Sequence, residues 1–150
     1  KLKDKFLEKV KLTDLININF EKFNKNKKIK IIKNIQDEEP EIIYKDEIMY
    51  ALGNIIQNAI NYCTDTVTVE LYYKKTNIFL RVFDDGMGFS KDIIDKLGEP
   101  YISNNKDGMG LGIFIAKNLI ENMGGKIEFF NSAENKAVVE INFKNSILII

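Results

Sequence analysis

The sequence predicts an α/β (α+β) two-layer sandwich, in which a mixed, mostly antiparallel sheet of about five strands carries about three helices on one face. Two kinds of apolar spacing and the chain length lead to this fold class. Long segments with apolar residues at helical spacing lie between shorter segments with alternating apolar residues, and turn formers separate the two kinds. The 150 residues contain no repeat or low-complexity tract, which suits a single domain.

The first half of the chain alternates helical and strand patterns. Over residues 1–23 the apolar side chains can share one helix face, and Thr13 or Asp14 can cap a helix near the middle of this stretch. After a polar, basic turn, the isoleucines of 29–35 indicate a strand. A second helix is expected over 45–62, because its apolar residues recur every three or four positions and form one stripe.

The second half of the chain adds two strand pairs and two helical segments. The strands are expected over 67–73, 78–82, 127–129 and 139–143, where apolar residues alternate. A short helix is expected over 90–97 and a longer one over 111–123, which Gly124 and Gly125 stop. The segment between them, 98–108, is rich in turn formers and is expected to be a loop.

The composition excludes several kinds of chemistry. The 22 Lys and Arg residues balance 22 Asp and Glu, so a basic nucleic-acid-binding surface is not expected. The chain has no His, and no step within it can use a histidine as base, nucleophile, metal ligand or phosphoacceptor. The single Cys63 cannot form an internal disulfide, and we interpret it as a small buried apolar residue.

The ends of the sequence carry no targeting segment. The apolar runs are too short to span a bilayer, and no signal peptide is present. Because the chain starts at Lys1 and not at Met, we expect it to be a piece of a longer protein.

Two glycine-rich segments and a pair of asparagines are candidates for a ligand site. Gly-Met-Gly-Leu-Gly at 108–112 opens a helix, where free backbone N–H groups and the helix dipole favour an anion. Asn54 and Asn58 lie one turn apart on one helix face, and an amide oxygen suits Mg²⁺. Alone, each feature has an ordinary explanation, either glycines at positive φ or solvated polar residues. Together with Asp84, before the glycines at 86–88, they indicate a nucleotide site.

The three motifs, in chain order, resemble the N, G1 and G2 boxes of the histidine-kinase catalytic and ATP-binding domain. They are Asn-Ile-Ile-Gln-Asn-Ala-Ile-Asn-Tyr at 54–62, Val-Phe-Asp-Asp-Gly-Met-Gly at 82–88 and Gly-Met-Gly-Leu-Gly at 108–112. That family shares the Bergerat ATP-binding fold with gyrase B, Hsp90 and MutL. The resemblance covers roughly residues 29–143, and the segments 97–101 and 110–117 look most like redox-responsive sensor kinases of the RegB type.

The resemblance implies a role for each matching residue. Asn58 would coordinate Mg²⁺ bridging the ATP phosphates, and Asn54, the candidate catalytic residue of this chain, would lie close to the same phosphates. Asp84 would accept a hydrogen bond from the adenine amino group, and Tyr62 would form an aromatic wall of the adenine pocket, unless it is plain core packing. The other implied ATP-binding residues are Asn61, Gly86, Gly88, Ser103, Lys106, Gly108, Met109, Gly110, Leu111 and Gly112.

Within this set, the glycines and the loop have distinct implied roles. Gly86 and Gly88 would let the backbone approach the base, and the glycines of 108–112 would shape the hinge and phosphate cradle of an ATP lid over about 98–107. Lys106 is a candidate ligand of the terminal phosphate, with a solvated lid residue as the equal alternative. Ser103 lies where related kinases often have Thr.

Two positions depart from the family pattern. Asn61 stands where the family frequently has Lys or Arg against a phosphate, which weakens that contact, and Lys106 is a candidate to compensate. Lys136-Ala137 replaces the usual Gly-Thr pair before the last strand. We expect the second change to affect a turn more than the site.

The residue at position 54 separates two kinds of reaction. ATP-hydrolysing relatives generally have Glu there to activate water, whereas an amide cannot act as a general base. Transfer of the γ-phosphoryl group to a protein nucleophile is therefore favoured over hydrolysis. In the family the acceptor is a His on a preceding dimerisation domain, which lies outside this sequence, with residues 1–11 as the expected tail and linker and 12–150 as the catalytic domain.

The resemblance also implies cofactors, partners and a location. It implies ATP and Mg²⁺ as cofactors, the His-containing dimerisation domain and a response regulator as partners, and no nucleic acid. A homodimer of the full-length protein is expected through the missing domain, this chain alone being a cytoplasmic monomer. The alternatives are a nucleotide-binding regulatory module without kinase activity and an ATPase of the gyrase or Hsp90 type.

Overall fold

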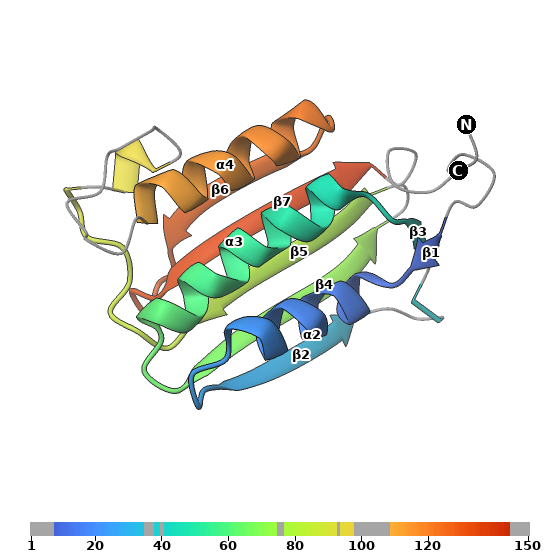
Figure 1. Ribbon diagram of the computed structural model, residues 1–150. Coiled ribbons are helices and arrows are strands. Elements are labelled where there is room, and N and C mark those ends of the chain that lie inside the picture. Colours follow the sequence, from blue (N-terminus) through green and yellow to red (C-terminus); the bar gives the residue numbers. More distant parts are fainter. Residues whose placement is uncertain are drawn as a thin grey trace.

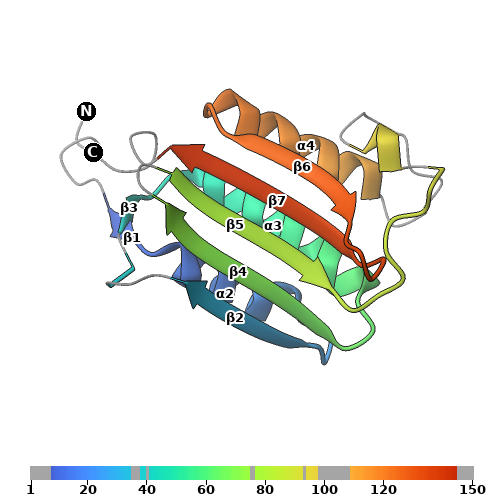
Figure 2. The same cartoon turned by 180° about the vertical axis from the view of Figure 1, so that it is seen from behind.

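Three helices cover one face of a five-stranded sheet in the computed structural model of the protein, which describes residues 8–34, 38–39, 41–74, 77–92, 94–97 and 109–144. The helices are α2 (Leu12–Phe23), α3 (Asp46–Tyr62) and α4 (Met109–Asn122). They lie side by side in front of the sheet in Figure 1, and the view from behind in Figure 2 shows the face of the sheet that carries no helix. This arrangement confirms the expected two-layer sandwich.

The sheet is mixed, with strand order β2-β4-β5-β7-β6. Its strands are β2 (Lys28–Asn34), β4 (Thr66–Lys74), β5 (Asn77–Asp84), β6 (Lys126–Asn131) and β7 (Ala137–Lys144). Only β2 and β4 are parallel among these neighbours, and they are joined through α3; the other pairs are antiparallel. A separate two-stranded sheet pairs β1 (Lys9–Val10) with β3 (Ile42–Ile43).

Alternation of side chains along β5 fixes what faces the helices. Ile78, Leu80 and Val82 are each at most 1% exposed and pack in the core with the inward residues of β4 and the apolar stripe of α3. Asp84 follows two residues after Val82 and is also buried, at 6% exposed. Because side chains in a strand alternate between faces, the same register that buries the apolar residues also turns the Asp84 carboxylate inward.

The helix expected over 1–23 is wrong over the described residues 8–11. Lys9–Val10 is a strand, because it pairs with Ile42–Ile43, and residues 1–7 lie outside the described part of the chain. The residue before the helix is Lys11, which makes no side-chain capping bond, so neither Thr13 nor Asp14 is the cap. Helical spacing of apolar residues could not reveal a strand whose partner lies more than thirty positions away, as the Lys9–Ile43 register shows.

The helix expected over 90–97 is also too long. Among the described residues of this segment, only Ile94–Lys96 is helical, as one 3₁₀ turn. The preceding Phe89 is held at both its N–H and its C=O by the side chain of Asn131. The expected loop over 98–108 lies outside the described residues.

The remaining elements agree with the sequence patterns. Helix α4 ends as expected, since Gly124 has a φ of +83° and the N–H of Gly125 donates to Ile120 O at 3.0 Å. Cys63 is buried and unbridged, as interpreted. None of the helices in the described ranges is long and apolar enough to cross a membrane.

The first turn of α2 depends on a buried carboxylate. Glu39, 8% exposed, accepts hydrogen bonds from the Thr13 N–H at 3.2 Å and the Thr13 hydroxyl at 2.7 Å, and Lys33 Nζ lies 3.4 Å from it. We expect Glu39→Ala to lower the free energy of unfolding by about 2 kcal/mol, because it leaves these donors without their partner.

Urea denaturation measures this effect, and Glu38→Ala is the matched control. Glu38 is exposed, so its removal should change the free energy of unfolding by less than about 0.5 kcal/mol. Equal stability of the two variants would contradict the assigned role of Glu39.

Candidate functional site

The C-terminal ends of α3 and β5 and the N-terminal end of α4 meet at one edge of the molecule (Figure 1). Helix α4 begins at Met109, so the glycine-rich segment opens this helix as expected. A Cβ atom placed on Gly112 would lie 3.3 Å from Asn54 Oδ1, which shows that the second glycine motif packs against the asparagine face of α3. The fold thus brings together motifs that are far apart in the sequence.

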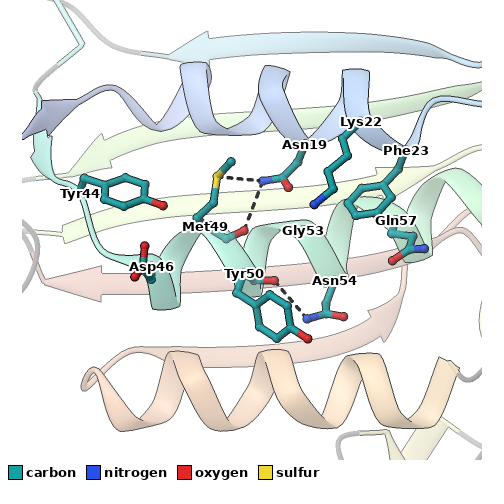
Figure 3. A pocket seen from close by; sticks show the side chains of 10 residues that line it. All are labelled: Asn19, Lys22, Phe23, Tyr44, Asp46, Met49, Tyr50, Gly53, Asn54 and Gln57. Carbon is teal, nitrogen blue, oxygen red and sulfur yellow. Dashed lines mark hydrogen bonds between the residues drawn. The ribbon is translucent and has the colours of Figure 1, made fainter.

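Asn54 and Asn58 of α3 are the two asparagines that the sequence predicts in the site. Asn54 donates from Nδ2 to Tyr50 O at 3.1 Å, and its Oδ1 is the atom that faces Gly112 (Figure 3). Asn58 lies one turn later and is half-buried. Amide oxygens are hard ligands, so Asn58 fits a divalent cation such as Mg²⁺ that takes its other ligands from phosphate and water.

Asp84, the last residue of β5, is a buried carboxylate at the same edge. Burial raises the pKa of Asp84, the nearby charge of Asp85 raises it further, and the Gly86 N–H and the Lys136 ammonium act in the opposite direction. The Gly86 N–H donates to Asp84 Oδ1 at 2.7 Å. A carboxylate removed from water in this way gains strongly from a further donor, such as an exocyclic amine of a bound base.

The glycines at 86 and 88 are required by close backbone approach. A Cβ on Gly86 would lie 2.1 Å from the Tyr62 carbonyl oxygen at the end of α3. Gly88 has a φ of +83°, and a Cβ there would lie 2.4 Å from Asn135 O. The loop over 85–89 is therefore pressed between the end of α3 and the turn that joins β6 to β7.

Asp85 ties this loop to the connection between α3 and β4. Its carboxylate accepts hydrogen bonds from the backbone N–H groups of Thr64, Asp65 and Thr66 at 2.8 to 3.1 Å. Desolvation alone would raise the pKa of Asp85, but these N–H donors outweigh it and hold the pKa below its usual value. Sequence reasoning assigned no role to this residue, whose partners lie 19 to 21 positions away.

The turn between β6 and β7 holds the other side of the loop. Asn131 accepts from the Phe89 N–H at 2.8 Å and donates to Phe89 O at 2.9 Å. Lys136 Nζ donates to Gly86 O at 3.0 Å and to Asp85 O at 3.4 Å. Lys136, expected to affect a turn more than the site, thus also contacts the loop over 85–89 that follows Asp84.

A lysine from another segment reaches position 61. Lys25, in the turn after α2, donates from Nζ to Asn61 Oδ1 at 3.0 Å, and both side chains are exposed. A positive charge thus lies beside the residue where the resemblance leads one to expect Lys or Arg. No sequence pattern predicts this pairing, because the two residues are 36 positions apart.

Several residues expected in the site cannot be placed. Ser103, Lys106 and Gly108 lie outside the described residues. Met109 and Leu111 are placed on the first turn of α4 by their backbone only, together with Gly110. Tyr62, the last residue of α3, is half-buried, and its backbone carbonyl forms the contact with Gly86.

A cavity of about 410 Å³ lies between α2 and α3 (Figure 3). Asn54 and Gln57 line it from α3, and Lys22 and Phe23 line it from α2. Among the described residues, neither Asp84 nor Gly86 belongs to its lining. The cavity therefore adjoins the site at Asn54 and is separate from the end of β5.

The model of one protein family matches residues 44–147, and its description is histidine kinase-, DNA gyrase B-, and HSP90-like ATPase. Among curated proteins, the sensor histidine kinase RegB of Cereibacter sphaeroides is 33% identical over 109 residues, which covers 65% of this chain and 24% of RegB. The sensor protein KdpD of Clostridium acetobutylicum is 29% identical over 138 residues, covering 81% of this chain and 14% of KdpD. The chain thus spans about a quarter or less of the length of these relatives.

Solved structures share the fold. The catalytic domain of the histidine kinase ThkA in a nucleotide-free form superposes with a TM-score of 0.75 at 24% identity, covering 93% of this chain and 95% of that domain. The mycobacterial sensor histidine kinase MprB superposes with a TM-score of 0.74 at 20% identity, covering 92% of this chain and 97% of the other.

The role of Asp85 can be tested by its removal. We expect Asp85→Ala to lower the free energy of unfolding at neutral pH by about 1–2 kcal/mol, because three N–H groups lose a charged acceptor. The folded-state pKa of Asp85 is lowered, so this stabilisation is present above the pKa of an unfolded Asp and is lost as the pH falls through the folded pKa. The difference from the parent protein should therefore shrink in acid.

Chemical denaturation over a series of pH values measures the difference in free energy of unfolding between Asp85→Ala and the parent protein. The matched control is Asp92→Ala, at an exposed position, with an expected change below about 0.5 kcal/mol. A constant difference between Asp85→Ala and the parent at every pH would rule out the charged acceptor.

Proposed function

The chain belongs to the histidine kinase-, DNA gyrase B- and HSP90-like ATPase family, and we propose that it is the ATP-binding catalytic domain of a two-component sensor histidine kinase. The observation that carries this proposal is the buried Asp84 carboxylate at the end of β5, on the same edge as the asparagine face of α3 and the first turn of α4. These groups supply an acceptor for a base, amide oxygens and the positive end of a helix dipole.

Each part of the site has a task in binding Mg·ATP. Asp84 accepts a hydrogen bond from the adenine amino group and disfavours guanine, which presents a carbonyl oxygen at that edge. Asn58 would hold Mg²⁺, whose contribution when bound is to neutralise phosphate charge. Asn54 lies against Gly112, which lets its side chain approach the backbone of α4 and orient the phosphate end of the nucleotide.

The reaction is transfer of the γ-phosphoryl group to a histidine. Asn54 is an amide and cannot remove a proton from water, so this chain has no general base at that position for hydrolysis. The sequence contains no His, so the acceptor is on a dimerisation domain outside it, from which a response regulator receives the phosphoryl group. In this proposal residues 1–11 are the end of that domain and its linker, and residues 12–150 are the catalytic domain.

Lys25 offsets the missing charge at position 61. Its ammonium group is held by Asn61 Oδ1, which is a neutral acceptor and leaves the full positive charge available to a phosphate. The charge that the family usually places on α3 is thus supplied from the turn after α2.

The Asp84→Asn variant should change ATP affinity and folding stability in opposite directions. We expect ATP to bind more weakly by about 2–3 kcal/mol, because an amide cannot replace a buried charged acceptor. Burial raises the folded-state pKa of Asp84, so the fold is most stable with Asp84 protonated, and this stability is lost as the pH rises through that pKa. At neutral pH the neutral Asn should therefore raise the midpoint of thermal unfolding.

Calorimetric titration with Mg·ATP and a thermal melt without nucleotide provide the two measurements. Asp95→Asn, at an exposed position, is the control and should alter neither. Unchanged ATP affinity in Asp84→Asn would remove Asp84 from the base pocket.

Phosphorylation in trans tests the reaction. Incubated alone with γ-labelled ATP and Mg²⁺, the chain should gain no acid-labile phosphate, since it has no His. Addition of the histidine-containing domain of the parent protein should give labelled histidine on that domain, and Asn58→Ala should slow the labelling and weaken its dependence on Mg²⁺.

The other outcomes of this experiment identify other functions. Steady release of phosphate without a phosphoprotein would indicate a gyrase- or Hsp90-type ATPase. Binding of ATP with neither labelling nor release would indicate a regulatory nucleotide-binding module.

A further inference from the structure

One peptide group joins a cation to the buried carboxylate of the site. The Asp85 carbonyl oxygen accepts a hydrogen bond from Lys136 Nζ at 3.4 Å, and the N–H of the same peptide group, on Gly86, donates to Asp84 Oδ1 at 2.7 Å. Lys136 Nζ also donates to Gly86 O at 3.0 Å. The ammonium group and the carboxylate thus lie at opposite ends of the peptide bond between Asp85 and Gly86.

This arrangement strengthens the bond to Asp84. A cation at a carbonyl oxygen polarises the peptide group and makes its N–H a better donor, and such chains of hydrogen bonds reinforce one another in a protein interior. Lys136 also acts on Asp84 directly through its charge and opposes the effect of burial. Both effects favour the ionised carboxylate, which is the form that accepts a hydrogen bond from an amine.

The other titratable groups around Asp84 do not favour its ionised form. Asp85, on the same loop, disfavours the ionised form of Asp84 through its like charge. Cys63, at the end of α3, has a raised pKa because it is buried, and its thiol is neutral at physiological pH. Lys136, in the turn just before β7, is the positive group that acts on Asp84 among the described residues.

The position of Lys136 is fixed by its own turn. Ser132 Oγ accepts from the Lys136 N–H at 3.1 Å, and the Ser132 N–H donates to Lys136 O at 2.8 Å. Asn135, at a φ of +62°, places its carbonyl against Gly88. The turn that carries the lysine therefore contacts the loop over 85–89 at several points.

We propose that Lys136 is a positioning residue of the nucleotide site, which acts through the peptide group between Asp85 and Gly86 to keep Asp84 ionised and directed at the adenine amino group. The inference rests on the proposed function, because it assigns to Asp84 the recognition of the base. It gives the charged residue at 136, where the family usually has an uncharged Gly-Thr pair, a role in selecting and holding the nucleotide.

Two substitutions at position 136 test the role. Lys136→Met keeps much of the apolar stem and removes the charge, while Lys136→Arg keeps the charge and the donors. The affinity for Mg·ATP is measured by calorimetry across the acidic and neutral pH range, with Lys126→Met, at an exposed position of β6, as the control.

We expect Lys136→Met to bind ATP roughly tenfold more weakly at neutral pH, as for loss of a charge-assisted hydrogen bond. As the pH falls, its affinity should decline at a higher pH than that of the parent, because Asp84 takes up its proton more readily without the nearby cation. Lys136→Arg should restore both the affinity and the pH profile, and Lys126→Met should match the parent.

A purely structural tether would give a different result. If Lys136 only held the loop, Lys136→Met would weaken binding equally at every pH, and an unshifted profile would overturn the proposal. Carbon-13 NMR of the Asp84 carboxyl group without nucleotide provides the independent measurement, and an identical titration in the parent and Lys136→Met would overturn it equally.

The same NMR titration separates this inference from the proposed function. If the parent chain bound no ATP, the proposed function would fail, while a shifted Asp84 titration in Lys136→Met would still show that Lys136 controls its ionisation. If the parent bound ATP and the titration did not shift, only the role of Lys136 would fail. Lys136→Gln repeats the test should Lys136→Met be unfolded.

Discussion

The burial of the Asp84 carboxylate at the end of β5 is the constraint on which the candidate site depends. The alternation that places Ile78, Leu80 and Val82 in the core continues for two more residues and turns a charged group inward. A buried carboxylate with few partners is unfavourable, and burial raises the pKa of Asp84 accordingly. The surrounding loop must therefore bring donors and positive charge to this carboxylate while leaving it able to accept another hydrogen bond.

The loop achieves this because it is fixed from two sides. Asp85 accepts from the N–H groups between α3 and β4, and two residues outside the recognised motifs, Asn131 and Lys136, bind the loop from the side of β6 and β7. The two glycines permit contacts that any Cβ would block. The geometry of the loop is thus set by the connections at the ends of β4, β6 and β7, and such preorganisation lowers the entropy lost on binding.

The parts that the sequence predicted share one property, which is that their signal is local. Helix α3, the hairpin of β4 and β5, and the start of α4 follow from residue spacing over short stretches, and the Asn54, Asp84 and Gly112 motifs are short segments as well. The parts it missed depend on contacts between distant residues. β1 pairs across more than thirty positions, Lys25 reaches Asn61 over 36, and Lys136 reaches Gly86 over 50, so neither spacing nor propensity carries a signal for them.

A consequence for the balance between stability and function follows from the raised pKa of Asp84. At neutral pH the folded chain without nucleotide must keep this carboxylate ionised against burial, and a neutral residue there would suit the fold alone better. Groups that bind ligands often lower the stability of the folded protein in this way. In the proposed function, a nucleotide that donates to Asp84 would remove this conflict and would stabilise the domain by linkage, because it would bind the folded state. The charge of Lys136 opposes the effect of burial on Asp84 in the same direction, so in this proposal it would set how much of the conflict a bound nucleotide has to resolve.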